Sequence, residues 1–306
     1  MIFSVGDSRW VKLFFGCVVF FTLLVGGINY WIDYYGLFRD LPSKNLVFYG
    51  NERTSKYLYS YRYLPQRYDG LLIGSSFSNN WDTSLIRSSR VYNASLDGGN
   101  ISEGKLIFDN VQDHGGVRLL VVGIYPHLTV GHGRQSGFMD PREYWGALGS
   151  IQLFREYMTK FLVKIGARNN YFGEHGRYAF EFPEEQIQKF YANSESGRGK
   201  QTFVVNEVAV KEFEELLKSA RAHGTEIIGF VPPIYSVFYN ENRSEYEAYI
   251  ARMSAFFLPS EKVINFNLAP YQDDVKNPKT FQDGVHLTTK AADMFSRKLA
   301  SIVDAR

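Results

Sequence analysis

The chain has 306 residues, a hydrophobic content of 45% and a formal net charge of +2. The hydrophobic content is enough for a sizeable core, and the near-neutral charge argues against a dedicated nucleic-acid binder, which would carry a strong basic excess. Cys17 is the single cysteine, so an intrachain disulfide, a cysteine-based zinc site and a cysteine nucleophile in the soluble part are excluded.

An uncharged apolar run occupies residues 13–32, and as an α-helix it would span the ~30 Å of a bilayer core. Arg9 and Lys12 precede the run and Asp33 follows it. By the positive-inside rule, we expect residues 1–33 to form a short cytoplasmic tip and an uncleaved transmembrane anchor, with the remainder outside the cytoplasm. The alternatives are a buried core helix and a cleaved signal peptide, which the lack of an A-x-A-like cleavage site disfavours.

Residues 34–66 are rich in tyrosine and in charges of both signs, which predicts a juxtamembrane connector with some ordered structure. From residue 67 to 306, short apolar strands alternate with amphipathic helices. Strands are predicted at 69–74, 91–94, 117–124, 225–231 and 262–266, and helices at 102–113, around 213–220, at 244–257 and around 291–302. This alternation predicts an α/β domain of three layers, α/β/α, with a mostly parallel sheet.

The stretch from about 127 to 205 interrupts the alternation and is too long for a simple connection, so we expect an insertion there. Within it, residues 144–165 mix apolar and basic side chains. Two interpretations stay open for this stretch. It is a lid helix packed on the domain, or an interfacial helix that lies on the membrane or docks against an integral partner.

Two short motifs more than two hundred residues apart carry the chemistry. The first predicted strand ends in Gly74-Ser75-Ser76, and Asp283 and His286 stand just before the closing helix. A serine hydroxyl needs a base within hydrogen-bond reach, and His286 can supply it while Asp283 orients the imidazole. Ser76 is the candidate nucleophile and Ser75 its rival. Each motif alone could instead be a simple helix cap.

The chain order Ser, Asp, His is that of α/β-hydrolases, but their G-x-S-x-G elbow is absent. The motifs resemble the SGNH (GDSL-type) hydrolase superfamily, whose first block appears as Gly74-Ser75-Ser76 and whose last block, D-x-x-H, spans 283–286. The resemblance implies that residues 93–99 form the second block, so that Gly98 or Gly99 donates a backbone N–H to an oxyanion hole, with the Ser76 amide as the second donor.

One departure from this family concerns its third block, G-x-N-D. At that place the chain reads Gly123-Ile124-Tyr125-Pro126, so no asparagine is available as an oxyanion donor. The G-S-S form together with an N-terminal anchor resembles the branch that includes the D-alanyl transfer protein of teichoic-acid modification and the proteins of bacterial polysaccharide O-acetylation. This branch implies a multispanning membrane O-acyltransferase as partner.

We therefore expect a single-pass protein of the bacterial inner membrane whose C-terminal domain, in the periplasm or outside the cell, is a serine acyltransferase or esterase. The expected reaction is O-acylation of a polysaccharide or another hydroxyl acceptor. The alternatives are a catalytically degenerate domain that binds glycan or scaffolds an assembly complex, and a free-standing lipase-like esterase. No cofactor is expected. A metal site at His127 and His132 is disfavoured because no carboxylate or cysteine cluster accompanies them.

Overall fold

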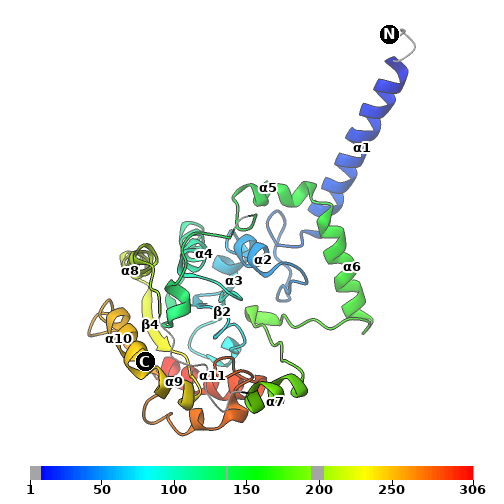
Figure 1. The fold of residues 1–306 in the computed structure, drawn as a ribbon. Coiled ribbons are helices and arrows are strands. Elements are labelled where there is room, and N and C mark those ends of the chain that lie inside the picture. The colour runs from blue at the N-terminus through cyan, green and yellow to red at the C-terminus, as the bar shows by residue number, and fades with distance from the viewer. Residues whose placement is uncertain (1–7, 136, 194–202, 306) are drawn as a thin grey trace, which may run out of the picture.

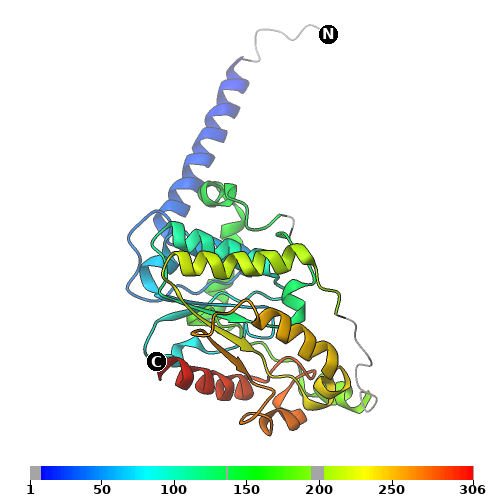
Figure 2. The ribbon, with the colours of Figure 1, turned by 90° about the vertical axis from the view of Figure 1, so that its left-hand side faces the viewer.

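The computed structural model describes residues 8–135, 137–193 and 203–305. Helix α1, Ser8–Ile32, projects from the body of the protein in both views (Figures 1 and 2). Its large apolar side chains are exposed, and it is the one helix in the described part of the chain that is long and apolar enough to cross a membrane.

The domain is built on one five-stranded parallel sheet, which confirms the predicted α/β fold class. In spatial order the strands run β2-β1-β3-β4-β5, and every neighbouring pair is parallel. The strands are β1 Gly70–Ile73, β2 Val91–Asn93, β3 Leu119–Gly123, β4 Glu226–Val231 and β5 Lys262–Asn265. All five lie within the ranges predicted from the sequence.

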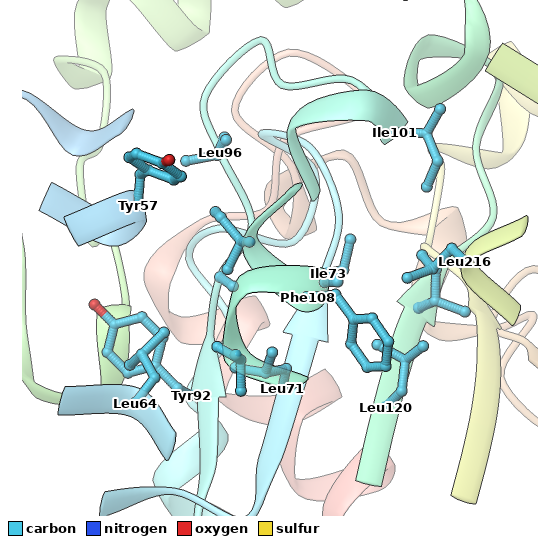
Figure 3. Close-up of a cluster of buried hydrophobic side chains, with 14 of the residues drawn as sticks. Tyr57, Leu64, Leu71, Ile73, Tyr92, Leu96, Ile101, Phe108, Leu120 and Leu216 are labelled. Carbon is cyan, nitrogen blue, oxygen red and sulfur yellow. The ribbon is translucent and has the colours of Figure 1, made fainter. Parts of the chain in front are cut away.

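One face of the sheet is covered by α4, Ile101–Asp113, α8, Glu207–Ala222, and α10, Arg243–Ser254. Alternate strand residues point to this face, as the pleat requires. Figure 3 shows Leu71 and Ile73 of β1 in one cluster with Phe108 of α4 and Leu216 of α8. All four side chains are fully buried.

The opposite face is covered by α11, Thr289–Asp304. Phe295 and Leu299 of this helix pack with the other set of alternating strand residues, which includes Leu72 and Val121. Helices on both faces of a parallel sheet make three layers, and the carboxyl ends of the strands are then the edge at which ligands bind in such folds.

The segment that follows α1 folds onto the domain. It contains α2, Glu52–Tyr59, and α3, Tyr63–Arg67. Its tyrosines are largely buried and belong to the same hydrophobic cluster as β1 and α4. Figure 3 shows two members of this segment, Tyr57 and Leu64, at the edge of that cluster.

The stretch between β3 and α8 holds α5, Arg142–Gly149, α6, Gln152–Lys164, and α7, Glu184–Asn193, while α9, Ser236–Glu241, follows β4. Asn29 near the end of α1 donates from Nδ2 to the Leu148 and Ser150 carbonyls, at 2.8 and 3.1 Å. The Tyr157 hydroxyl donates to Asn29 Oδ1 at 2.8 Å. Helices α5 and α6 are thereby joined to the end of the apolar helix. Several apolar side chains along them remain exposed: Trp145, Ile151, Phe154, Met158, Phe161 and Ile165.

Candidate active site

Ser76 lies in the loop that follows β1, at the carboxyl edge of the sheet. Gly74 begins this loop, and a Cβ there would lie 2.1 Å from Ser78 Oγ, so a larger residue would force the Ser78 side chain to move. The buried Asn93 of β2 donates from Nδ2 to the carbonyls of Ser78 and Trp81, at 2.7 and 3.1 Å. The loop is thus fixed to the neighbouring strand while Ser76 itself stays partly exposed.

Asp283 and His286 lie in a tight turn before α11. Asp283 Oδ1 accepts the backbone N–H groups of Val285 at 3.2 Å and of His286 at 2.9 Å, and Gly284 adopts a positive φ of 83° in the turn. The turn is joined to the nucleophile loop because Asn80 donates from Nδ2 to the Leu287 carbonyl at 2.8 Å. Two segments far apart in sequence are therefore held together by direct hydrogen bonds.

The structure brings the three predicted residues into one hydrogen-bonded chain. His286 Nδ1 lies 2.8 Å from Asp283 Oδ2, and His286 Nε2 lies 2.9 Å from Ser76 Oγ. With the proton on Nδ1 donated to the carboxylate, the lone pair of Nε2 faces the serine hydroxyl and can accept its proton. The rival Ser75 is buried with 3% exposure, and its carbonyl accepts the Ser78 amide.

The aromatic ring of Phe77 fixes the other side of the imidazole. It stacks on His286 with ring centroids 4.9 Å apart and an interplanar angle of 14°. Phe77 also packs on Tyr125, with centroids 4.0 Å apart. The imidazole is therefore held by a carboxylate at its edge and by a ring against its face.

The Leu96 amide donates to the Gly74 carbonyl at 3.2 Å, which joins the loop before Gly98 to the nucleophile loop. The backbone amides of Ser76 and Gly98 both lack an acceptor among the described residues. The amide of Gly99, by contrast, donates to the Leu96 carbonyl at 3.0 Å. Gly98 is exposed and has a positive φ of 57°. Of the two glycines named from the sequence, Gly98 has the N–H that is left for a ligand.

Tyr125 lies just after β3, at the carboxyl edge of the sheet. Its hydroxyl lies 3.3 Å from the hydroxyl of Tyr246 in a buried contact. His127, two residues later in the turn Pro126–Thr129, lies edge-on to Phe77 with centroids 6.0 Å apart. Its pKa is lowered, first by burial and second by the nearby His286. In the described ranges, no group of three side chains that could hold a metal ion is found.

Sequence reasoning missed a second set of residues, in α2. Lys56 is fully buried and donates from Nζ to Glu52 Oε1 at 2.9 Å and to the Ser95 carbonyl at 2.6 Å. Glu52 Oε2 accepts the Asp97 amide at 2.8 Å, and Arg53 donates to the Asp97 carbonyl at 2.7 Å. Three side chains of α2 therefore hold the loop immediately before Gly98.

The sequence matches no family model and no curated protein. Among solved structures, it is similar to a protein described as a platelet activating factor from Streptococcus pneumonia, with 13% identity, 82% of this chain and 93% of that chain covered, and a TM-score of 0.43. It is also similar to a GDSL-like lipase from Bacteroides thetaiotaomicron and to an acylhydrolase from Bacteroides fragilis. Each has 11% identity, 77% of this chain covered and a TM-score of 0.39, with 87% and 86% of their own chains covered. We therefore draw the function from the geometry of this chain's own residues.

Proposed function

We propose that the protein is a membrane-anchored serine acyltransferase or esterase that acts outside the cytoplasm. The observation that carries this proposal is the continuous hydrogen-bonded chain from Ser76 Oγ through the His286 ring to the Asp283 carboxylate. A serine is activated as a nucleophile by such an arrangement. The two amides at Ser76 and Gly98, which lack acceptors in the described part of the chain, supply the donors that an oxyanion requires.

In the first half of the reaction, Ser76 Oγ attacks the carbonyl carbon of an acyl ester and its proton passes to His286 Nε2. The negative charge that forms on the carbonyl oxygen is stabilised by the Ser76 and Gly98 amides, and donors of this kind contribute on the order of 3–4 kcal/mol each. The C–O bond to the donor alcohol then breaks, and the alcohol leaves with the proton from Nε2.

In the second half, a hydroxyl group replaces the donor alcohol. Its proton passes to Nε2, its oxygen attacks the acyl carbon, and Ser76 Oγ leaves and regains a proton. If this hydroxyl belongs to a polysaccharide, the protein is an O-acyltransferase. If it belongs to water, the protein is an esterase. Transfer is our preferred outcome because α1 would keep the domain beside export machinery in the inner membrane.

The proposed location of the domain outside the cytoplasm also bears on the source of the acyl group. Activated acyl donors are made in the cytoplasm, so a domain outside it needs a multispanning membrane O-acyltransferase to deliver the group. The exposed apolar side chains of α5 and α6, next to the end of α1, are where such a partner would dock.

The test uses the full chain in detergent micelles with p-nitrophenyl acetate as donor and soluble polysaccharides as acceptors. We expect p-nitrophenol release that is lost in Ser76→Ala and His286→Ala, and acetyl esters on a polysaccharide detected by mass spectrometry. Release without any acetylated polysaccharide would identify an esterase. Equal release by the folded wild type and both variants would contradict a serine mechanism and favour the second candidate, a glycan-binding or scaffold domain, which the loss of the third-block asparagine at Tyr125 also favours.

A further inference from the structure

A cavity of about 590 Å³ lies outside the Ser76 site, between α6 and the segment that precedes α2. Figure 1 shows α6 standing apart from the sheet on the side where α2 and α3 lie. One wall comes from residues 49–51, another from α6 and a third from residues 168–178. The cavity is open to solvent on one side, where the exposed residues Arg155, Arg168 and Tyr171 lie at its edge.

The third wall is a cluster of aromatic rings. Phe172 and Tyr178 stack with centroids 4.8 Å apart and an interplanar angle of 26°. Tyr171 lies beside them, 41% exposed, and packs edge-on against Phe180 with centroids 5.1 Å apart. Rings held in this way by their neighbours present fixed apolar faces to a ligand.

The opposite wall carries a carboxylate that lacks a full set of partners. Glu156 Oε2 is buried and has no hydrogen-bond partner among the described residues. The pKa of this carboxyl is raised by burial, and the nearby Arg155 and Arg168 offset the rise only in part. The carboxylate packs against Gly50, where a Cβ would lie 2.2 Å from its atoms. A buried polar atom without a partner is costly, so this oxygen calls for a donor that the described residues do not supply.

Hydrogen-bonding groups complete the lining. Asn170 is held by donating from Nδ2 to the Phe172 carbonyl at 2.8 Å, and Arg168 donates to Thr159 Oγ1 at 3.2 Å. Arg155 has no hydrogen bond or ion pair to another described residue. The cavity thus combines aromatic faces with a carboxylate, carboxamides and guanidinium groups.

We propose that this cavity binds a segment of the sugar polymer that accepts the acyl group. A pyranose ring has an apolar C–H face that packs on an aromatic ring and a rim of hydroxyls that donate to carboxylates and accept from guanidinium groups. A purely apolar acyl chain fits this lining less well, because it would leave the carboxamide and guanidinium groups of the lining without partners.

The aromatic wall is connected to the nucleophile loop. The Tyr178 amide donates to the Asn79 carbonyl at 2.7 Å, and Arg177 Nε donates to the Asn80 carbonyl at 2.8 Å. Asn79 is three residues after Ser76. A polymer bound along this wall therefore passes beside the loop that carries the serine. The role as acceptor site rests on the proposed function, whereas sugar binding does not.

The experiment measures binding of three pentasaccharides, a β-1,4-glucan, a β-1,4-linked N-acetylglucosamine polymer and a β-1,4-mannuronate, to the full chain in micelles by calorimetry. We expect saturable binding of at least one at millimolar concentration or below. Tyr171→Ala should weaken it by about tenfold, since a lost ring contact of about 1.4 kcal/mol gives that factor, while Tyr171→Phe, which keeps the ring, should retain it.

Gly50→Ala is a second variant, because its methyl group would clash with the Glu156 carboxylate and displace it. It should also weaken binding, and p-nitrophenyl acetate turnover should persist in all three variants. The failures are distinguishable. Binding that depends on Tyr171 without any ester turnover would overturn the proposed function and support the sugar site. Binding of none of the three sugars, or binding unchanged in Tyr171→Ala and Gly50→Ala, would overturn the sugar site whatever the turnover.

Discussion

The ammonium of Lys56 donates to the main-chain carbonyl of Ser95 across 2.6 Å, although the two residues are 39 positions apart. Ser95 begins the short loop that ends at Gly98, the proposed oxyanion donor. Because Glu52 and Arg53 hold Asp97 in the same loop, α2 sets the position of this amide. Any other geometry of this loop would remove the hydrogen bonds that buried Lys56 and Glu52 make to the Ser95 carbonyl and the Asp97 amide, and that loss disfavours it.

Replacing Lys56 by methionine should lower kcat with little change in KM. The shape of the side chain is retained but the donor to Ser95 is lost, so the Gly98 amide is no longer held in place. Misplacement of a catalytic donor by about 1 Å costs up to about a hundredfold in rate, and we expect a fall of roughly tenfold to a hundredfold. Steady-state kinetics with p-nitrophenyl acetate measures it.

The single variant also leaves Glu52 buried without its partner, which costs about 3–5 kcal/mol of stability. The double variant Glu52→Gln/Lys56→Met is the control, since it removes both charges. It should recover most of the lost stability but not kcat. If kcat recovered together with stability, the role of Lys56 would be structural only.

Gly98→Ala tests the oxyanion assignment directly. At a φ of 57° a side chain is strained by about 1–2 kcal/mol, and the new methyl group stands beside the amide. Gly224→Ala is the matched control, because Gly224 has a φ of 71°, ends α8 and leaves room for a methyl group, with no described atom within 4 Å of the Cβ position. Both variants should lose similar stability in urea unfolding, but only Gly98→Ala should lose activity. Equal activity in the two would contradict the assignment, because it would mean that a methyl group beside the Gly98 N–H leaves oxyanion binding undisturbed.

Asp283→Asn should lower kcat by a factor of roughly 10³–10⁴. The NH₂ group of asparagine, placed where Oδ2 stands now, cannot accept a hydrogen bond from Nδ1–H, so the imidazole is held in the wrong tautomer. The backbone N–H groups of Val285 and His286 can still bond to the remaining carbonyl oxygen, so the thermal midpoint should change little. A normal kcat in this variant would mean that the carboxylate does not act through His286.

A pH dependence of stability is expected from Glu261, away from the site. Burial acts to raise its pKa, but hydrogen bonds from the Arg221 guanidinium and the Leu258 amide outweigh burial, so that the pKa is lowered below 4.5. Because the folded pKa is below the unfolded one, the contribution is present above about pH 4.5 and is lost as the pH falls through the folded pKa.

Urea unfolding of wild type and Glu261→Gln checks this sign. At pH 7 the variant should be less stable by about 1 kcal/mol, which is the contribution of hydrogen bonds to a charged group reduced by solvent screening at the surface. The difference should shrink when both proteins are measured below about pH 4. A difference that grew toward acid pH would contradict the assigned direction.

The sequence predicted the sheet well because each strand is a compact apolar run between turn residues, as in the stretch that contains Leu119–Gly123. It also indicated Ser76, Asp283 and His286, since their residue types and order are informative without coordinates. It could not show which glycine amide is free, because that depends on the Gly99 hydrogen bond to Leu96.

The contacts that α2 makes with the loop before Gly98 could not be predicted from the local sequence pattern. Lys56 sits in a segment of mixed charge, and a lysine in such a segment is ordinarily exposed. Its burial follows from long-range packing of α2 on the loop that contains Ser95 and Asp97. The cavity at Glu156 is likewise lined by three segments that lie far apart in the sequence. Its aromatic residues alone were therefore only weak evidence for a sugar-binding site.

The central claim is that Ser76 is a nucleophile activated by His286. Intact-mass and peptide mass spectrometry after treatment with a fluorophosphonate tests it most directly, using the full chain in micelles. We expect a single covalent adduct that maps to Ser76, is absent in Ser76→Ala and forms far more slowly in His286→Ala. An unlabelled wild type, an adduct on another serine, or labelling at an unchanged rate in His286→Ala would contradict the claim.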